Sequence, residues 1–569
     1  MARPLLRLDR VSERAWGWIG PIGVAALAFV IRIWNVGYPN RLMFDETYYA
    51  KDAWSLLKHG YVQDYVEKAN EKVIAGDLTG LMTGQPTQIT HPDGGKWIIA
   101  IGEQIFGLDS FGWRISAVVI GTLTVLILAR LVRRLTGSTI IGCFAGLLLC
   151  FDGLHFVMSR IALLDGFLAF WIISGVACLV ADRDWVRERL HKYRVIRPWQ
   201  LLAGVCFGMA CGTKWSGVYV LAVFGVLVVI WEVLARREHT EDRGLKHHWV
   251  RTTLAVGVPA FFSIVGVAFV VYIATWTGWL IHHDLYEQRF GQGIGEGKGW
   301  GAYVNDPTGG PFGPTFDAFR SLWHYHRITW EFHTGDYLAG KTHPYQSNPL
   351  GWLVMERPVG VDAQNNLPAE SCGAAASSSC MREVLLLGNP VLWWTGALAL
   401  MAAVVAWIVE SNWRLGLSIF GTLAAIRVSV FFGNPIPHWL LSNSMIAWIL
   451  ALILIGAVAV WMSTCDSIWG VPILGVAASW LPWFISSGRP IFSFYAVVSI
   501  PFTIIAISLV VSGLVKAAET PRQRYAVWLV AGVLLTAVIA TFWFFHPIYT
   551  DDLISYDSWR DRMWFNRWI

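Results

Sequence analysis

The chain is dominated by apolar runs that are each long enough to cross a lipid bilayer. About 20 apolar residues in a helix span the roughly 30 Å of hydrocarbon. Only 15% of the residues are charged, whereas a soluble protein carries about a quarter. The sequence therefore predicts an all-α polytopic membrane protein, because a β-barrel would show short segments of alternating hydrophobicity instead. The long runs are 16–34, 113–131, 139–158, 160–181, 253–275, 389–409, 441–461, 490–513 and 526–545.

The number of spans depends on three less regular stretches. The run 200–235 is too long for one helix, and GTKWSG at 212–217 interrupts it, so we expect two short helices there. Two shorter apolar stretches lie at 415–432 and 468–486. We therefore expect thirteen transmembrane helices, or eleven if some of these segments are re-entrant.

Basic residues collect in segments that thirteen crossings place on one side of the membrane. Because Lys and Arg are enriched in cytoplasmic loops, we expect this side and the N-terminus to be cytoplasmic. The N-terminal region lacks a small-residue cleavage site, so the first span is expected to remain as a signal anchor. The basic segments are 3–14, 130–134, 182–197, 236–251 and 516–524, and the hydrophilic segments left outside are 35–112, 276–388 and 546–569.

Two cysteines share the second outer segment, in ESCGAAASSSC. Thiols this close in an extracytoplasmic loop favour a disulfide, Cys372–Cys380, over a metal pair. The chain has no His/Cys cluster with zinc spacing, no P-loop and no GxGxxG at the start of a helix. We therefore expect neither nucleotide-driven chemistry nor a nucleic-acid partner.

Ionisable side chains collect at the outer ends of the spans. A charge at membrane depth costs several kcal/mol unless it serves a cavity or has a partner. Two adjacent acids, Asp45 and Glu46, follow the first span in LMFDETYYA (42–50). The other ionisable residues on this side are Arg32, His91, Asp93, Lys96, Arg114, Arg160, Asp165, Lys214 and Arg489.

Structural explanations exist for several of these residues. Asp45 could cap an amphipathic stretch that lies on the membrane surface with Tyr48, Tyr49, Trp54 and Leu56. Arg32 and Arg114 could extend to the lipid headgroups. The remaining alternatives are an Arg160–Asp165 ion pair, a helix break solvated by Lys214, and an ordinary loop role for His91.

The convergence of these charges on one face favours a chemical role. Several cations facing one pocket suit an anionic headgroup, most simply a phosphate. A carboxylate beside them suits proton abstraction from a neutral hydroxyl. The residues therefore predict group transfer from a lipid phosphate at the outer leaflet.

A set of motifs spread over nearly the full chain carries a resemblance to a known family. The motifs are FDE (44–46), HPDGGKW (91–97), FDGLHFVMSRIALLDGFLAFW (151–171), GTKWSG (212–217), LLLGNPVLWW (385–394) and WLPWFISSGRPIFSFYAV (480–497). Together they resemble bacterial protein O-mannosyltransferases, which are membrane-embedded glycosyltransferases of the GT-C type. In HPDGGKW, the family usually has a second Pro and a Leu-like residue, so the role of Asp93 stays open.

The resemblance implies a reaction and the residues that perform it. The expected donor is a polyprenyl-phosphate mannose, and the acceptor is a Ser or Thr hydroxyl on a secreted or membrane protein. A single displacement would invert the anomeric configuration, with Asp45 as the base and Glu46 in acceptor binding. No cofactor is required if enough cations converge, although a divalent metal stays open. The expected donor- and phosphate-binding residues are Arg32, His91, Lys96, Arg114, Arg160, Lys214, Arg489 and Tyr495, with Asp165 in support.

The resemblance also implies how the chain is divided. Residues 1–275 would form the catalytic transmembrane module, and 276–388 are too few to hold the β-trefoil module of eukaryotic members. Further spans would occupy 389–545, followed by an outer tail, 546–569. The protein would lie in the bacterial plasma membrane with its active site outside, in contact with membrane lipids and with a secretion translocon as a candidate partner.

Two other functions fit part of the sequence. A GT-C enzyme that glycosylates a lipid or a polysaccharide would share the acid pair and the cationic pocket, but HPDGGKW, SRIALLDG and GTKWSG favour the protein O-mannosyl branch. A transporter or flippase would place polar residues near the midplane and often repeat its halves. The charges here lie at one face instead.

Overall fold

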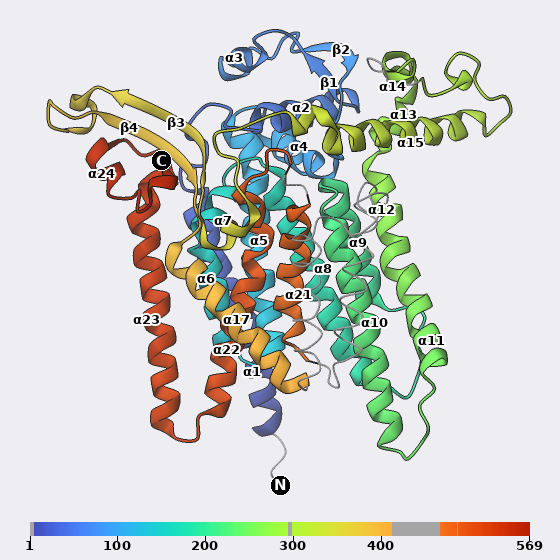
Figure 1. Ribbon diagram of the computed structural model, residues 1–569, viewed down its shortest axis with the longest axis vertical. Coiled ribbons are helices and arrows are strands. Elements are labelled where there is room, and N and C mark those ends of the chain that lie inside the picture. Colours follow the sequence, from blue (N-terminus) through green and yellow to red (C-terminus); the bar gives the residue numbers. More distant parts are fainter. Residues whose placement is uncertain (1–4, 294–298, 412–466, 486–487) are drawn as a thin grey trace, which may run out of the picture.

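The computed structural model describes residues 5–293, 299–411, 467–485 and 488–569, and it is a helical bundle with a layer of loops and short helices at one end (Figure 1). Within these ranges, 8 helical segments are long and apolar enough to cross a membrane. They are Ala15–Ile33, Ser110–Thr136, Leu164–Arg187, Gly217–Glu241, Trp249–Thr275, Pro390–Glu410, Ile500–Ala517 and Pro521–Ile548. Two shorter apolar helical segments, Thr139–Cys150 and Gly470–Phe484, accompany them.

The bundle is built from long and short helices, and the central ones, such as α5 and α8, each pack against several others. Its helices are α1 (Leu5–Ile33), α5 (Ser110–Thr136), α6 (Thr139–Cys150), α7 (Gly153–Met158), α8 (Leu164–Arg187), α9 (Pro198–Thr213), α10 (Gly217–Glu241), α11 (Trp249–Phe261) with α12 (Val267–Thr275), α17 (Pro390–Ser411), α21 (Gly470–Trp480), α22 (Ile500–Ala517) and α23 (Pro521–Phe545). A π-helical turn, Phe262–Gly266, joins α11 to α12.

The outer layer consists of shorter elements. These are α2 (Glu46–His59), β1 (Gln63–Tyr65), α3 (Ala69–Ile74), β2 (Met82–Pro86), α4 (Gly94–Phe106), α13 (Thr277–Ile281), α14 (His283–Phe290), α15 (Gly313–Thr334), α16 (Asp336–Ala339), β3 (Val359–Leu367), β4 (Cys380–Leu386), β5 (Ile554–Ser555) and α24 (Tyr556–Arg560). Strands β1 and β2 pair antiparallel, and β3, β4 and β5 form a second antiparallel sheet. The sequence did not predict these strands.

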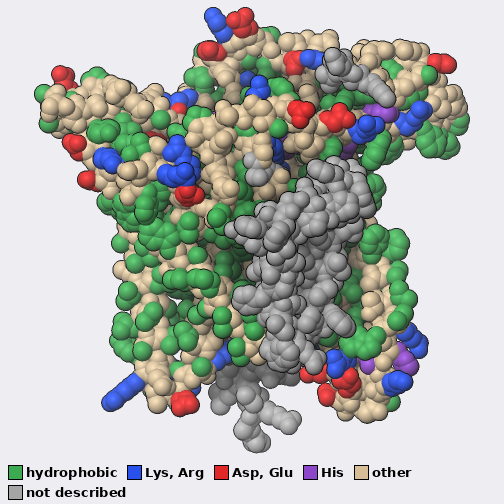
Figure 2. Space-filling view, in the orientation of Figure 1, with side chains coloured by type: hydrophobic (Ala, Val, Ile, Leu, Met, Phe, Trp, Pro, Cys, Tyr) green, Lys and Arg blue, Asp and Glu red, His purple; other side chains and the backbone are tan. Residues whose placement is uncertain are grey.

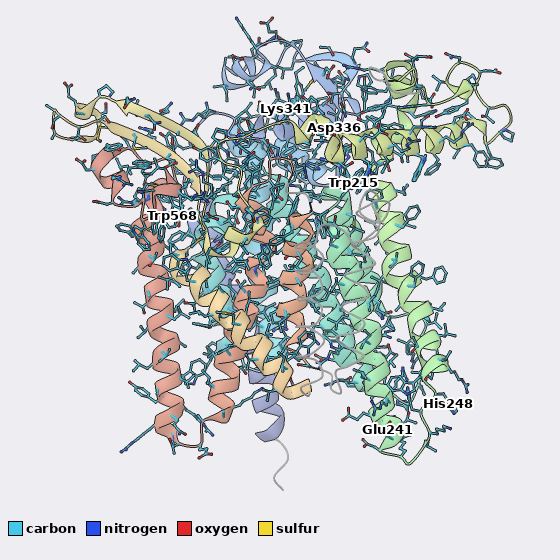
Figure 3. The ribbon with its side chains drawn as sticks, viewed as in Figure 1. Trp215, Glu241, His248, Asp336, Lys341 and Trp568 are labelled. Atoms are coloured by element: carbon cyan, nitrogen blue, oxygen red, sulfur yellow. A yellow bond between two sulfur atoms is a disulfide. The ribbon has the colours of Figure 1, made fainter. Side chains whose placement is uncertain are left out.

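The two ends of the bundle have the arrangement expected from the charge pattern. The three hydrophilic segments and the C-terminus lie at one end, and the N-terminus and the α10–α11 and α22–α23 connections lie at the other (Figure 1). Asp336 and Lys341 mark the first end, and Glu241 and His248 the second (Figure 3). Figure 2 shows charged side chains gathered at both ends of a largely apolar middle.

Several predicted spans differ from the observed helices. The run 139–158 is interrupted, because α6 ends at Cys150 and Asp152 caps the start of α7. The predicted break at 212–217 is present, but α10 has 25 residues, so the expectation of two short helices is wrong for the second one. The run 490–513 begins with a 3-10 turn, Ser493–Val498, before α22. The predicted spans 415–432 and 441–461 lie outside the described residues.

The amphipathic stretch after Asp45 packs into the protein rather than lying on the membrane surface. Tyr49 and Leu56 are buried, and of the expected surface residues only Tyr48 is largely exposed. Glycines allow α4 to approach its neighbours closely: a Cβ on Gly102 would lie 2.4 Å from the Gly112 carbonyl oxygen. The first outer loop is therefore anchored directly on the outer ends of the spans.

The hairpin β3–β4 ties the C-terminal tail to the second outer loop. Cys372 and Cys380 form the predicted disulfide in this hairpin. Cys380 pairs across the sheet with Ser555, and Met381 pairs with Ile554. Residues far apart in the chain therefore form one outer layer above the bundle.

Asp152 is fully buried and joins two segments that lie far apart in the chain. Its carboxylate accepts hydrogen bonds from the backbone N–H groups of His155 at 2.9 Å and Asn389 at 3.0 Å. It also accepts one from the Trp393 indole at 2.7 Å. These bonds fix α7 against the start of α17.

We expect Asp152→Ala to destabilise the protein by roughly 2–4 kcal/mol, because buried donors would be left without an acceptor. Thermal unfolding in detergent should show a clearly lower Tm for Asp152→Ala. Asp152→Asn keeps one acceptor oxygen, so its Tm should lie between those of the unaltered protein and Asp152→Ala. Asp184→Ala is the matched control, because Asp184 forms an exposed pair with Arg134 at 3.0 Å. If Asp152→Ala were as stable as this control, the hydrogen bonds of Asp152 would not be what holds α7 against α17.

Candidate active site

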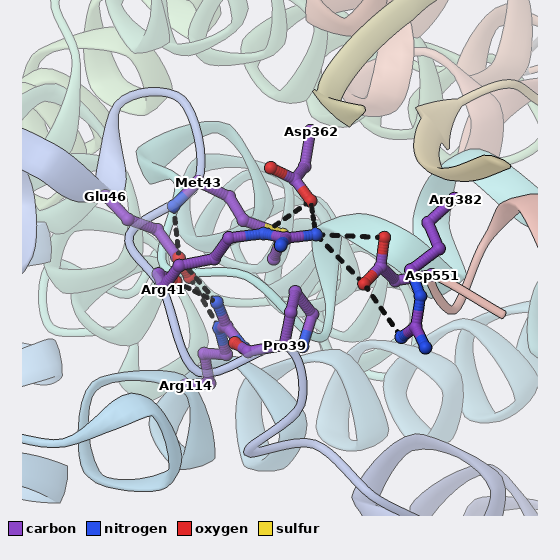
Figure 4. Close-up of polar contacts among 8 residues, drawn as sticks. All are labelled: Pro39, Arg41, Met43, Glu46, Arg114, Asp362, Arg382 and Asp551. Atoms are coloured by element: carbon purple, nitrogen blue, oxygen red, sulfur yellow. Dashed lines mark hydrogen bonds and ion pairs between the residues drawn. The ribbon is translucent and has the colours of Figure 1, made fainter. Parts of the chain in front are cut away.

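The acid pair begins α2, and Glu46 is fully buried there. Its two carboxylate oxygens accept hydrogen bonds from Arg114 Nε at 2.9 Å, from Arg114 Nη2 at 2.8 Å and from the Met43 backbone N–H at 3.0 Å (Figure 4). The backbone N–H of Ala162 donates a fourth, also at 3.0 Å. Glu46 therefore has little capacity left for a ligand.

Arg114 holds the loop that leads to the acids. Beyond Glu46, its guanidinium donates to the carbonyl oxygens of Val36 at 3.3 Å, Pro39 at 2.9 Å and Arg41 at 2.8 Å. The side chain is fully buried, so the alternative in which Arg114 extends to lipid headgroups is wrong.

A second ionic group lies on the outer side of the same loop. Arg41 forms an ion pair with Asp362 on β3 and another with Asp551 of the C-terminal tail, the latter at 3.0 Å (Figure 4). Arg382 on β4 lies 4.0 Å from the same Asp551 carboxylate. The loop between α1 and α2 is therefore fixed from both sides.

Asp45 has a different environment from its neighbour. It occupies the N-cap position of α2, but its side chain makes no capping hydrogen bond, so the capping explanation is wrong. The residue as a whole is half-buried, and the Tyr49 hydroxyl donates to its carboxylate at 3.5 Å. Burial raises the pKa of Asp45 to about 6; the positive charge of Lys214 opposes this shift, and the negative charge of Asp165 adds to it. Asp45 is therefore a carboxylate with free acceptor capacity and increased basicity.

Lys214 and Asp165, whose charges both act on Asp45, form an ion pair with each other. Lys214 ends α9, Asp165 lies in the first turn of α8, and Lys214 Nζ lies 2.9 Å and 3.0 Å from the two Asp165 oxygens. The Lys214 ammonium also lies 4.2 Å from the centre of the Tyr495 ring. Asp165 is thus paired with Lys214, and the alternative of an Arg160–Asp165 pair is wrong.

A pocket of about 110 Å³ opens beside this ion pair. His91, Lys214 and Arg489, which the sequence predicted as donor-binding residues, all line it. A smaller adjoining pocket contains Asp165 and Tyr495. The two pockets share Ser216, Tyr219 and Trp483, and the first is completed by Trp215, Trp330, His333, Thr334, Pro482 and Ile485.

The wall of the pocket contains polar atoms that have no hydrogen-bond partner among the described residues. These are Arg489 Nε and His333 Nδ1, both buried. His333 Nε2 lies 2.9 Å from the Thr90 carbonyl oxygen, which only accepts, so Nε2 carries the proton and Nδ1 is left as an acceptor. Burial lowers the pKa of His333 to about 4 and lowers the pKa of His91 well below its ordinary value, so both rings are neutral at pH 7. The pocket therefore offers a free cationic donor and a free neutral acceptor.

Two other predicted cations, Arg32 and Arg160, are buried away from this pocket. Arg32 lies 3.1 Å from His155 Nδ1 and donates to the Cys150 carbonyl oxygen at 3.4 Å. Arg160 donates to the carbonyl oxygens of Arg32 at 2.6 Å and Trp34 at 2.7 Å. These contacts fix the junction of α1, α6 and α7, so the alternative in which Arg32 extends to lipid headgroups is wrong.

Lys96 lies between two carboxylates below α2. Its Nζ is 3.0 Å from Asp52 and 3.2 Å from Asp93. Lys96 and Asp93 therefore connect α4 to α2.

Among the residues that the structure describes, no group of three or more His, Cys, Asp or Glu side chains is arranged to hold a metal ion.

Sequence reasoning missed the contribution of α15. Trp330 and His333 reach the pocket from this helix, and His333 stacks on His91 with ring centres 5.4 Å apart. The only available signal was an aromatic-rich segment, WEFHTGD, in a long outer loop. Such segments are too common at membrane interfaces to identify a site.

Comparisons with known proteins agree with the motifs. Residues 23–277 match the model of the dolichyl-phosphate-mannose-protein mannosyltransferase family, and residues 318–428 match the C-terminal four-transmembrane region of protein O-mannosyltransferases. The polyprenol-phosphate-mannose–protein mannosyltransferase of Mycobacterium tuberculosis is 30% identical over 98% of this chain and 92% of its own length. The protein of the same name from Mycolicibacterium smegmatis is also 30% identical, over 98% and 94%.

The fold agrees as well. One chain of the Saccharomyces cerevisiae protein O-mannosyltransferase Pmt1–Pmt2 complex, solved with the sugar donor bound, superposes with a TM-score of 0.62 at 14% identity and covers 97% of this chain and 92% of that one. The predicted GT-C fold is confirmed. By its sequence and its fold, the chain belongs to the dolichyl-phosphate-mannose-protein mannosyltransferase family.

Proposed function

We propose that the protein transfers mannose from polyprenol-phosphate-mannose to a Ser or Thr hydroxyl of a protein acceptor, with Asp45 as the general base. The family and the names of its close relatives support the donor and the acceptor class. The observation that carries the residue assignment is the position of Asp45: it is partly exposed, makes no capping bond and lies beside the Lys214–Asp165 pair.

The pocket supplies the positive charge that a phosphate leaving group needs. Lys214 and Arg489 line it, and Arg489 Nε has no partner among the described residues. Donors that are already in place stabilise the charge that develops on the departing phosphate without reorganisation. We therefore propose that no cofactor is required for this step.

Asp45 completes the chemistry on the acceptor side. The hydroxyl oxygen attacks the anomeric carbon of mannose as the bond between that carbon and the phosphate oxygen breaks. Asp45 takes the hydroxyl proton, and polyprenyl phosphate leaves with the bonding electrons. A single displacement of this kind inverts the anomeric configuration, as the family resemblance implies.

The contacts divide the remaining predicted residues into two groups. His91, Lys214, Arg489, Asp165 and Tyr495 lie at the pockets and are proposed to contact the donor or to support those that do. The second group is proposed to position the first through its buried hydrogen bonds, and it contains Glu46, Arg114, Arg32, Arg160 and Lys96. We therefore assign Glu46 to loop positioning instead of acceptor binding.

We propose that the pocket faces the extracytoplasmic side of a bacterial plasma membrane. The pocket lies at the end of the bundle that carries the outer layer, as Trp215 shows, whereas the basic connection that contains His248 lies at the opposite end (Figure 3). Basic loops are typical of the cytoplasmic side, which also places the N-terminus there. An acceptor polypeptide could then reach the site as it leaves a secretion translocon.

We expect Asp45→Asn to lower the rate of mannose transfer by about 10²- to 10⁴-fold, because the amide cannot accept the hydroxyl proton. Donor affinity should change little, since Asn has the same size. The measurement is transfer from purified lipid donor to a Ser/Thr-rich peptide in detergent, with exposed Asp77→Asn as the control. Near-normal turnover by Asp45→Asn would contradict the role of Asp45 as base.

We expect kcat/KM of the unaltered protein to fall as the pH drops through about 6, the pKa of Asp45. Only the ionised carboxylate accepts a proton, so kcat/KM reaches its plateau above this pKa and decreases tenfold per pH unit below it. The fall is measured by recording kcat/KM for mannose transfer as a function of pH, with the Tm recorded at each pH to exclude unfolding. A midpoint near pH 4, the ordinary range of an aspartate, would show that the pKa of the base is not raised and would contradict this prediction.

We expect Arg489→Ala to weaken donor binding by at least about tenfold, since a hydrogen bond to a charged group contributes about 1.5–3 kcal/mol. Equilibrium binding of radiolabelled polyprenol-phosphate-mannose in detergent measures this. Arg489→Lys should recover part of the affinity, because it keeps the charge but loses the planar guanidinium. Exposed Arg522→Ala is the control. Unchanged donor affinity in Arg489→Ala would show that Arg489 is structural.

A further inference from the structure

Helix α15 carries an exposed apolar stripe that the active-site chemistry does not explain. Phe312, Phe316, Phe319 and Trp323 are 70%, 64%, 47% and 68% exposed. Phe312 is the N-cap residue of α15 and the other three lie within the helix, and the spacing of four, three and four residues places all four side chains along one face. Large apolar side chains gathered in one exposed patch mark an interaction surface.

The opposite face of α15 is fixed to the protein. The Tyr325 hydroxyl binds the Ile89 backbone N–H at 2.5 Å, and the Ser321 hydroxyl donates to Glu287 at 2.7 Å. Tyr325 and Ser321 are fully buried. The stripe is therefore held outward by a well-packed helix.

The position of α15 identifies what the stripe meets. The helix lies across the outer ends of the spans instead of parallel to them, above α12 and next to α13 (Figure 1). Figure 2 shows hydrophobic side chains along the lower edge of this arm, above the apolar flank of the bundle. Phe269 and Val270 of α12 are exposed, as is Ile281 at the end of α13. Large apolar side chains are therefore exposed on both α12 and α15, which lies across its outer end.

We propose that α15 is an interfacial helix whose stripe (Phe312, Phe316, Phe319 and Trp323) inserts into the headgroup–acyl boundary of the outer leaflet. Two exposed cations, Arg320 and Arg327, lie along one edge of the stripe, and each forms a long ion pair with an acid of the same helix, Asp317 at 3.6 Å and Glu331 at 3.8 Å. A basic edge beside an aromatic face is typical of helices that lie in the plane of a membrane, where Arg meets lipid phosphates.

This placement connects the bilayer surface to the pocket. Trp330 follows Trp323 by seven residues, so it continues the same face of α15, and it lines the pocket together with His333. A prenyl-linked donor in the outer leaflet would meet the stripe before it meets Lys214 and Arg489. This path of the donor from the stripe to the pocket rests on the proposed function, whereas the contact of α15 with the membrane does not.

The membrane contact is tested by measuring depth directly. A spin label at Phe319→Cys, in nanodiscs of phosphatidylethanolamine and phosphatidylglycerol, should be accessible to oxygen and shielded from a water-soluble nickel chelate. A label at Glu331→Cys, on exposed Glu331 of the same helix, is the matched control and should show the reverse. Unaltered protein carried through the same labelling gives the background from its own cysteines. Equal nickel accessibility at both labels would overturn the proposal. Shielding of Phe319→Cys from both reagents, together with a doubled particle mass, would also overturn it and would identify another copy of the chain as the occupant of the stripe.

The connection to the pocket is tested by kinetics. The variant F316S/F319S/W323S should raise the apparent KM for a long-chain donor in nanodiscs by about fivefold or more, with kcat unchanged. With a short-chain, water-soluble donor in detergent, the same variant should match the unaltered protein. An unchanged KM in nanodiscs overturns the connection even where the depth measurement supports the membrane contact. If the unaltered protein used neither donor, the proposed function would be overturned, but the depth measurement would still test the membrane contact because it does not depend on activity. If the triple variant fails to fold, Phe319→Ser alone is used.

Discussion

The buried ion pair between Glu46 and Arg114 is the interaction on which the geometry of the site depends. Both side chains are fully buried, and removing two charges from water costs several kcal/mol for each ion. Such a pair is tolerated only when the remaining donors and acceptors are also satisfied. Here backbone groups of the loop between α1 and α2 provide those partners, such as the Pro39 carbonyl at 2.9 Å. The pair therefore converts a loop into a fixed support for Asp45.

This arrangement explains why two adjacent acids serve different purposes. Glu46 is saturated by four hydrogen bonds, whereas Asp45 has only a 3.5 Å contact from Tyr49 and burial that raises its pKa to about 6. A base must keep a free lone pair and a pKa close to the working pH. The saturated acid holds the backbone in place, which allows its neighbour to remain unsaturated.

The sequence predicted the location of the site better than the role of each residue. Apolar runs and basic loops were enough to place the charged residues on one face, and loop position was enough to pair Cys372 with Cys380. They did not separate Arg32 and Arg160 from Arg489, because the partners of the first two are mainly backbone carbonyls. Carbonyl positions depend on how helices end and pack, and no residue type reports them. His333 was missed for a related reason, since α15 reaches the pocket only through the tertiary fold.

The charges left in the pocket suggest an order of events. Lys214 is already paired with Asp165 at 2.9 Å, so before the donor binds only part of its charge is available to a phosphate. Arg489 has a free Nε among the described residues and can meet the single charge of the donor phosphodiester. In the proposed reaction, the phosphate gains a second charge as the bond to mannose breaks, and Lys214 would then interact more strongly with it. An ion pair shared in this way contributes more to the transition state than to the bound donor, which is the condition for a faster reaction and not merely tighter binding.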